Sequence, residues 1–200
     1  AKILNIAQTH RGKIGDTPVP MAGIPHHAAP NYVDRLTNAG KRVAICEQIQ
    51  DPKDAIGIVK RAVTQVVSPG VPYDLNQADH AQNFYLCSAY CENDIFSVCF
   101  IDFSSGKFFG FDNQPKHEFI NLLGKYTPKE IVSYPGQFAR STEIENYIDH
   151  IGALRNIISE DYFHPINGDH HLRRFVPNYE HDKLIKKSDR LKKSLCALSN

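Results

Sequence analysis

The order of apolar segments between residues 84 and 175 constrains the fold more than any other feature of this sequence. Five segments have the β-branched and aromatic residues typical of strands, and they lie at 84–90, 95–103, 107–112, 130–134 and 154–159. Apolar residues at helical spacing separate the last three strands, at 119–126 and 144–151, and a short helix is predicted at 169–175. The predicted element order is therefore β-β-β-α-β-α-β-α.

Three strands followed by strand-helix units is the order of the ribonuclease-H-like fold, so the sequence predicts an α/β domain of that kind over 83–180. The likeness concerns element order alone, and function cannot be read from it. Nucleases of this fold hold metal ions on carboxylates, one of them on the first strand. The first strand here, FYLCSAY, has no carboxylate, and Asp102 lies beside a turn, where we expect it to bond backbone groups.

The first 69 residues differ in character and predict a second, smaller α/β unit. Residues 11–18 (RGKIGDTP) predict a turn-rich loop. The following PVPMAGIPHHAAP, at 18–30, has four prolines, which exclude a regular helix and a central strand. Because this segment also carries Val19, Met21 and Ile24, we expect an ordered loop packed on a core.

Regular elements are expected after this loop. The spacing of Tyr32, Val33 and Leu36 predicts a helix that ends near Gly40, and β-branched residues predict strands at 43–49 and 58–67. We therefore expect two small domains, with a first unit at 1–69, a linker at 70–82, a ribonuclease-H-like unit at 83–180 and an amphipathic, lysine-rich helix within 181–200.

Charge is divided unevenly along the chain. The net charge is +4 over residues 1–70, −8 over 71–182 and +5 over 183–200, although the whole chain carries only +1. A polyanion such as DNA would be attracted to the first and last parts and repelled by the middle. The alternative interpretation is that the basic residues form an ordinary solvated surface.

Motifs for catalysis or metal binding are lacking in this sequence. Five cysteines form no CxxC pair, and the histidine pairs His26-His27 and His170-His171 are adjacent, so no metal site is expected. No GxSxG, Cys-His or GxxxxGK[ST] signature is present, so no catalytic or cofactor-binding residue is predicted. No apolar run approaches the roughly 18 residues that a membrane helix needs. We expect a cytoplasmic protein with reduced thiols.

The most specific feature is a set of short motifs in a fixed order. Residues 9–12 (THRG) precede PVPMAGIPHHAAP, and GKRVAICEQIQDP at 40–52, VVSPGV at 66–71 and DFSSG at 102–106 follow it. In that order and spacing the motifs resemble those of the MutS family of DNA mismatch-repair proteins. The resemblance covers most of the chain, strongly to residue 112 and by pattern beyond.

The resemblance implies a layout and a function. Residues 1–69 would be the later part of a mismatch-recognition domain, 83–180 a ribonuclease-H-like connector that is not a nuclease, and 181–200 the start of a lever helix. The family binds mismatched DNA by kinking it and signals to MutL through the connector. The Phe-x-Glu motif that probes a mispair and the clamp, core and ATPase domains are absent here, so we expect part of a larger homodimer. ATP and Mg would act in the full-length protein, and no enzyme activity is expected of this chain.

Site residues carry over from the family only where this sequence matches its pattern. Arg11 matches a basic residue expected to contact the DNA backbone, and His10 before it stands where the family more often has lysine. Met21 lies in the loop that the family places near the distorted base step, with His26 close by. Arg61 matches a basic residue on the last strand of the recognition domain. The resemblance thus predicts DNA binding by these five residues.

Two other functions are compatible with the sequence alone. A divergent metal-dependent nuclease would need clustered carboxylates around Asp102. A protein-interaction module that keeps only the ribonuclease-H-like unit would show no salt-dependent DNA binding.

Overall fold

The chain folds as two units, which are divided between Gln77 and Ala78, within the segment expected to be a linker. The computed structural model describes residues 1–54, 57–73, 84–164, 172–173, 176, 185 and 187–199. The mixed α/β class predicted from the sequence is confirmed. Most of the predicted linker and of the predicted helix at 169–175 lies outside the described residues.

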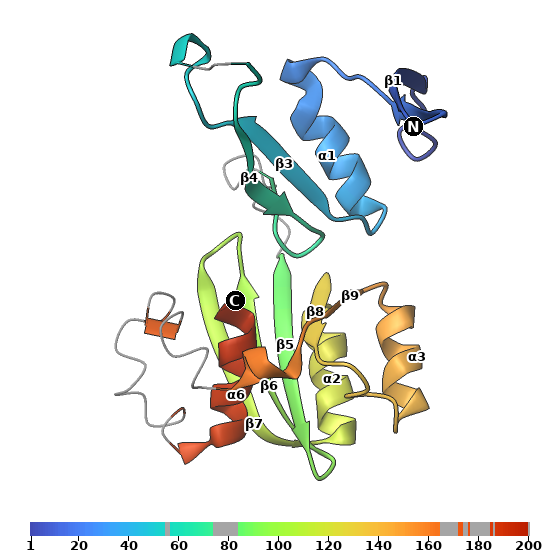
Figure 1. The fold of residues 1–200 in the computed structure, drawn as a ribbon. Helices are drawn as coiled ribbons and strands as arrows, with labels where there is room; N and C mark the ends of the chain where they lie inside the picture. Colours follow the sequence, from blue (N-terminus) through green and yellow to red (C-terminus); the bar gives the residue numbers. More distant parts are fainter. Residues whose placement is uncertain are drawn as a thin grey trace. The chain divides into compact units, whose positions relative to one another are not determined.

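The second unit is built on a five-stranded sheet in the order β7-β6-β5-β8-β9 (Figure 1). Its strands are β5 (Tyr85–Glu92), β6 (Ile95–Asp102), β7 (Lys107–Pro115), β8 (Glu130–Ser133) and β9 (Leu154–Ile157). β5, β6 and β7 are antiparallel neighbours, whereas β8 and β9 run parallel to β5. The predicted order of five strands and two intervening helices is confirmed, and the assignment to the ribonuclease-H-like fold stays a prediction.

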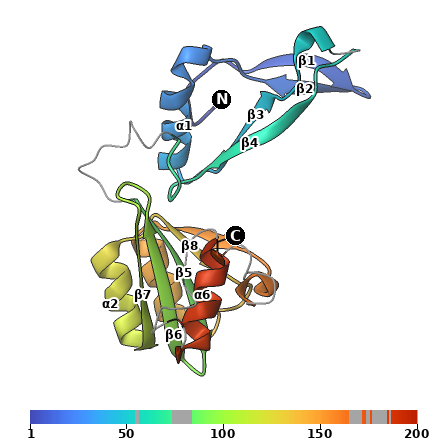
Figure 2. The ribbon, with the colours of Figure 1, turned by 90° about the vertical axis from the view of Figure 1, so that its left-hand side faces the viewer.

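Helices cover both faces of this sheet (Figure 2). Helices α2 (Lys116–Tyr126) and α3 (Thr142–His150) lie on one face, and α6 (Asp189–Ser199) lies on the other. The short helix η3 (Glu160–Phe163) contacts α6. Because successive strand residues point to opposite faces, β5 supplies Cys87 and Ala89 to the α2 side and Tyr90 to the α6 side.

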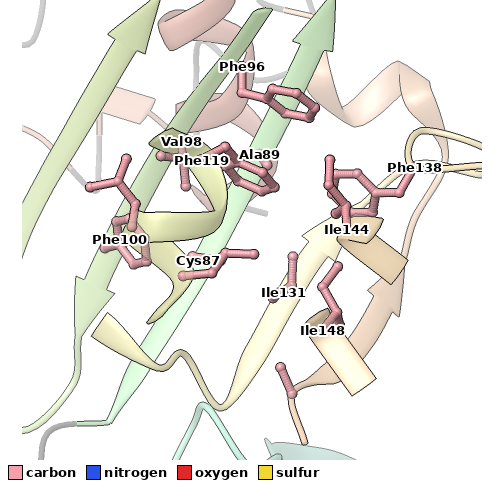
Figure 3. Close-up of a cluster of buried hydrophobic side chains, with 13 residues drawn as sticks. Cys87, Ala89, Phe96, Val98, Phe100, Phe119, Ile131, Phe138, Ile144 and Ile148 are labelled. Atoms are coloured by element: carbon pink, nitrogen blue, oxygen red, sulfur yellow. The ribbon is translucent and has the colours of Figure 1, made fainter. Parts of the chain in front are cut away.

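The core of the second unit lies between the sheet and helices α2 and α3 (Figure 3). Phe96 of β6 stacks on Phe119 of α2 with ring centres 4.5 Å apart, and both are buried. Ile144 and Ile148, on one face of α3, complete the cluster. The helical spacing seen in the sequence therefore reports the buried faces of α2 and α3.

Local turn chemistry sets the hairpins of the second unit. Asn93 and Asp94 join β5 to β6, and both have positive φ, as the tight turns that suit a twisted hairpin require. At the next turn, Asp102 accepts hydrogen bonds from the hydroxyls of Ser104 (2.7 Å) and Ser105 (2.6 Å) and from the amide of Phe84 (3.2 Å). The expected backbone-bonding role of Asp102 is confirmed.

The first unit contains a hairpin where a loop was predicted. Strands β1 (Thr9–Ile14) and β2 (Thr17–Met21) pair antiparallel, so the prediction of a turn-rich loop at 11–18 is wrong. Prolines 18 and 20 are compatible with β2 because a strand in a two-stranded ribbon has one unpaired edge, and alternate residues place their missing N–H groups there. The two strands lack the alternation of apolar and polar residues that usually marks a strand, because no residue of β1 or β2 is buried.

The rest of the first unit agrees with the sequence prediction. Helix α1 (Ala29–Asn38) is followed by Gly40, whose φ of +71° suits glycine at a helix end. Strands β3 (Val43–Gln48) and β4 (Arg61–Val67) then pair antiparallel as a second, separate ribbon. Short helices η1 (His26–Ala28) and η2 (Pro52–Asp54) occupy the connections.

Candidate nucleic-acid interface

The β1–β2 hairpin presents basic side chains to solvent. All six residues of β1 are exposed, including His10, Arg11 and Lys13. The hairpin contains a β-bulge. His10 pairs with Pro20 and Lys13 with Pro18, so two residues of β1, Arg11 and Gly12, lie opposite a single residue of β2. Gly12 has a φ of +68°, a conformation that glycine adopts without strain. The bulge therefore sets the direction in which Arg11 leaves the strand.

The proline-rich segment at 18–30, which begins within β2, is mostly exposed rather than packed. Met21 retains 41% of its surface and Ile24 is also exposed, so the expectation of a loop packed on a core is wrong. η1, which begins at His26, contains no buried residue. The prolines restrict the backbone dihedral angles of this segment, and its apolar side chains Met21 and Ile24 face solvent.

The sequence-predicted site residues fall on two ribbons. Met21 pairs with Thr9, so it shares the β1–β2 hairpin with His10 and Arg11. His26 lies a few residues further along, at the start of η1. Arg61 is exposed on the other ribbon, where it begins β4 and pairs with Gln48. The two ribbons are separate two-stranded sheets, so strand pairing does not join Arg61 to His10, Arg11 and Met21 of the β1–β2 hairpin.

Lys13 belongs with the hairpin cluster, although the family motifs do not single it out as a site residue. It lies two positions from Arg11 on the same exposed strand. The signal was present in the sequence, because Lys13 follows Arg11 by two residues, and the structure adds that both are exposed on one strand. By contrast, Arg35 has a structural role, because its guanidinium donates to the carbonyl of Leu4 at 2.8 Å.

Comparisons with known proteins show the family to which this chain belongs. Residues 1–76 match the family described as MutS domain I. Over 166 residues, which is 81% of this chain, the sequence is 35% identical to the DNA mismatch repair protein MutS of Staphylococcus epidermidis. It is 46% identical over 109 residues, or 54% of the chain, to the protein of that name from Streptococcus mutans. The chain belongs to the MutS family.

The chain spans less than a fifth of the length of these relatives. It covers 19% of the S. epidermidis protein and 13% of the S. mutans protein. A third relative, the DNA mismatch repair protein MutS of Parabacteroides distasonis, is 38% identical over 143 residues, which is 72% of the chain and 16% of that protein. The match to a domain I covers the ribbons and α1, so the exposed hairpin lies within a MutS domain I.

The described residues offer no support for the nuclease alternative. Burial by itself raises the pKa of Asp102, but hydrogen bonds from Ser105, Ser104 and the backbone hold that pKa below its ordinary value. Asp102 is only 2% exposed, and its carboxylate oxygens are occupied by these donors. In the part of the chain that the structure describes, no three His, Cys, Asp or Glu residues are grouped as metal ligands. No described helix is long and apolar enough to span a membrane.

Proposed function

We propose that this chain is the mismatched-DNA-binding and connector region of a protein that acts in DNA mismatch repair. The observation that carries the proposal is the β1–β2 hairpin, with three basic side chains on a strand of six exposed residues. A strand that buries none of its side chains contributes little to a core, so its basic residues are available for a polyanion. The relatives that match this chain are named DNA mismatch repair proteins, which supports DNA as that polyanion.

Arg11 and Lys13 would bind the phosphate backbone of the duplex. Arginine and lysine form charge-assisted hydrogen bonds with phosphate oxygens, and such contacts position a protein on DNA without reading its sequence. His10 precedes Arg11 on the same exposed strand and would add a further contact with the duplex. Arg61, which is exposed on the other ribbon, would add a further contact with the phosphate backbone.

Met21 and the segment up to His26 would lie against a distorted base step. Exposed apolar side chains can enter a minor groove that a kink has widened. A mispaired step stacks and pairs poorly, so bending it costs less free energy than bending a normal duplex. The exposed Met21 and Ile24 fit this contact better than a packing role. Discrimination of mismatches would then come from deformation rather than from hydrogen bonds to the bases.

The second unit would act as a connector that passes the DNA-bound state to a partner protein. Its acidic charge suits contact with MutL better than contact with DNA. We assign no catalytic residue to this chain. ATP and Mg belong to the proposal only for a full-length, homodimeric protein, since this sequence has no GxxxxGK[ST] phosphate loop. A cytoplasmic location follows from the same role.

Fluorescence anisotropy with matched and mismatched duplexes tests the DNA-binding part of the proposal. The 200-residue chain should bind both duplexes weakly, with an affinity that falls as salt rises and with little preference for the mismatch. Arg11→Ala and Lys13→Ala should each weaken binding and flatten the salt dependence. Lys125→Ala removes the same charge from the second unit and should change nothing. Equal effects of all three substitutions would contradict a specific role of the hairpin.

A further inference from the structure

The two edges of the five-stranded sheet differ in how they are protected. At the β7 edge, Asp112 and Asn113 form a bulge against Ser97, Asn113 has a positive φ, and Pro115 ends the strand. Arg190 of α6 donates a hydrogen bond to the side chain of Asn113. Bulges, prolines and covering groups are the features that prevent an edge strand from pairing with another chain. β9 is short, with 4 residues, but it has a regular register with β8 and contains no proline.

Hydrogen bonds to β8 determine which backbone groups of β9 face outward. The amides of Leu154 and Ile158 donate to the carbonyls of Lys129 and Ser133, each at 2.9 Å. Because alternate residues of a strand bond to the same neighbour, the N–H and C=O groups of Arg155 and Ile157 point away from β8. No strand of the described chain pairs with this outer edge. β9 therefore presents two donors and two acceptors in extended geometry.

Apolar side chains accompany these backbone groups. Ile157 is 59% exposed and Tyr162, in η3 just after β9, is 46% exposed. They are the exposed large hydrophobic residues of the second unit within the described ranges, and they lie five positions apart. Every other large apolar residue described in that unit is at least partly buried. An exposed apolar residue on an unprotected edge is typical of a site where an extended chain binds.

The charges near this edge indicate which kind of peptide segment would bind to it. Residues 142–161 carry five carboxylates and one arginine, and Glu143 pairs with Lys116 of α2 at 2.7 Å, so these groups together carry a net charge of −3. That arginine, Arg155, is engaged by α3, where it lies 3.0 Å from the carboxylate of Glu145 and 2.5 Å from that of Asp149. Arg155 also donates to the backbone oxygen of Glu145 at 2.8 Å, so its side chain joins β9 to α3. A basic segment is the complementary partner.

We propose that the outer edge of β9 binds an extended, basic segment of a partner protein, which adds a sixth strand to the sheet. Backbone hydrogen bonds to Arg155 and Ile157 supply affinity, an apolar side chain of the segment packs on Ile157, and lysine or arginine side chains are attracted by the net negative charge of residues 142–161. The site goes beyond the proposed function and does not depend on DNA binding by the first unit.

Hydrogen exchange of the full chain, measured by NMR, tests whether the edge is open. The amides of Leu154 and Ile158 should exchange slowly, whereas those of Arg155 and Ile157 should exchange fast in the free protein. Equal protection of all four amides would show that the edge is already paired and would overturn the proposal.

Selection from a displayed library of random peptides of roughly ten residues, with the full chain as target, tests the occupant. The binders should alternate apolar with basic residues. Two N-methylated versions of each peptide are compared, one methylated at the odd-numbered residues and one at the even-numbered residues. One version should bind at least about tenfold more weakly and the other almost normally, since only one of the two sets of amides faces β9. Strand addition at this edge would be refuted if both methylation patterns had the same effect. It would also be refuted if the selected peptides were acidic.

Variants of Ile157 localise the site. Ile157→Pro removes an outward N–H without removing a bond to β8, and Ile157→Lys adds a like charge to a basic peptide; both should weaken binding at least about tenfold. Ile157→Val should bind like the parent, and Ile14→Lys, at an exposed position of the first unit, should also have no effect. Unchanged binding by the folded Ile157→Lys variant would overturn the assignment.

Discussion

The ammonium nitrogen of Lys193 lies 2.9 Å from the hydroxyl oxygen of Tyr90 and 4.4 Å from the centre of the same ring. Lys193 belongs to α6 and Tyr90 to β5, so this contact joins the last helix to the central strand of the sheet. Burial alone lowers the pKa of Lys193, but the hydrogen bond from its ammonium to Tyr90 and nearby carboxylates raise that pKa above its ordinary value. The charged form of Lys193 is therefore the form that the folded protein stabilises.

Lys193→Met should loosen α6 from the sheet. The substitution keeps the apolar stem but removes the cation over the ring, so the free energy of unfolding should fall by about 1 kcal/mol. Urea unfolding followed by near-UV circular dichroism measures the change. Because the folded pKa of Lys193 is raised, its contribution is complete below about pH 10.4 and is lost as pH rises through the folded value, so parent and variant should converge in alkali. Lys187→Met, at an exposed position, is the control, and an equal loss there would contradict the specific role of Lys193.

Gly110→Ala should overpack the interface between β7 and α6. A Cβ at this position would lie 3.0 Å from Cδ1 of Leu191, 3.2 Å from Sγ of Cys99 and 3.3 Å from the backbone oxygen of Val98. We expect a loss of about 1–3 kcal/mol in the free energy of unfolding, measured by urea titration.

Two further variants separate crowding from other effects of the Gly110 substitution. Gly23→Ala has no heavy atom within 4 Å of its new Cβ and should be nearly neutral. Leu191→Ala combined with Gly110→Ala should cost less than the sum of the single changes, because the smaller side chain removes the clash with Cδ1. Strict additivity would show that Leu191 is not the source of the strain.

Asp102→Asn should make the second unit less stable and less sensitive to acid. Hydrogen bonds hold the folded pKa of Asp102 below its ordinary value, so its contribution is present above the unfolded pKa of about 3.9 and is lost as pH falls through the folded pKa. The asparagine should cost about 1–3 kcal/mol at neutral pH, because its NH₂ group cannot accept from Ser104 or Ser105. Urea titrations between neutral and acid pH check both effects. Asp16→Asn, at the exposed tip of the β1–β2 hairpin, should leave the profile unchanged, and a parallel shift there would argue against Asp102 as the source.

Gly12→Ala should weaken DNA binding without removing a charge. The φ of +68° at Gly12 costs an alanine about 1–2 kcal/mol, and the exposed hairpin has few other contacts with which to hold the bulge. The backbone that carries Arg11 and Lys13 would then change its course, and anisotropy with a DNA duplex should show a lower affinity. Gly23→Ala provides a glycine without positive φ as the comparison. An unchanged affinity of Gly12→Ala would mean that the bulge does not position the basic residues.

Local sequence patterns by themselves determined most elements of the second unit. Periodicity at Phe119, Leu122 and Leu123 depends only on residues within two helical turns, and strand alternation depends on neighbours two positions apart. Turn chemistry at Asp102 is equally local, since Ser104 and Ser105 lie within three residues of it. Such features can be predicted from the sequence because the interacting groups are close along the chain. The short motifs in the first half likewise indicated the MutS family, which the comparisons confirm.

Tertiary structure alone decided which segments lie together. The proline-rich β2 carries no strand periodicity, and it became a strand only through pairing with β1. Arg11 and Arg61 have the same charge and similar exposure, yet pairing placed them on different ribbons. The open edge of β9 depends on the order of strands whose residues are far apart in sequence. These arrangements reflect the balance between chain entropy and long-range packing, in which the interacting residues are not neighbours, so no local pattern records them.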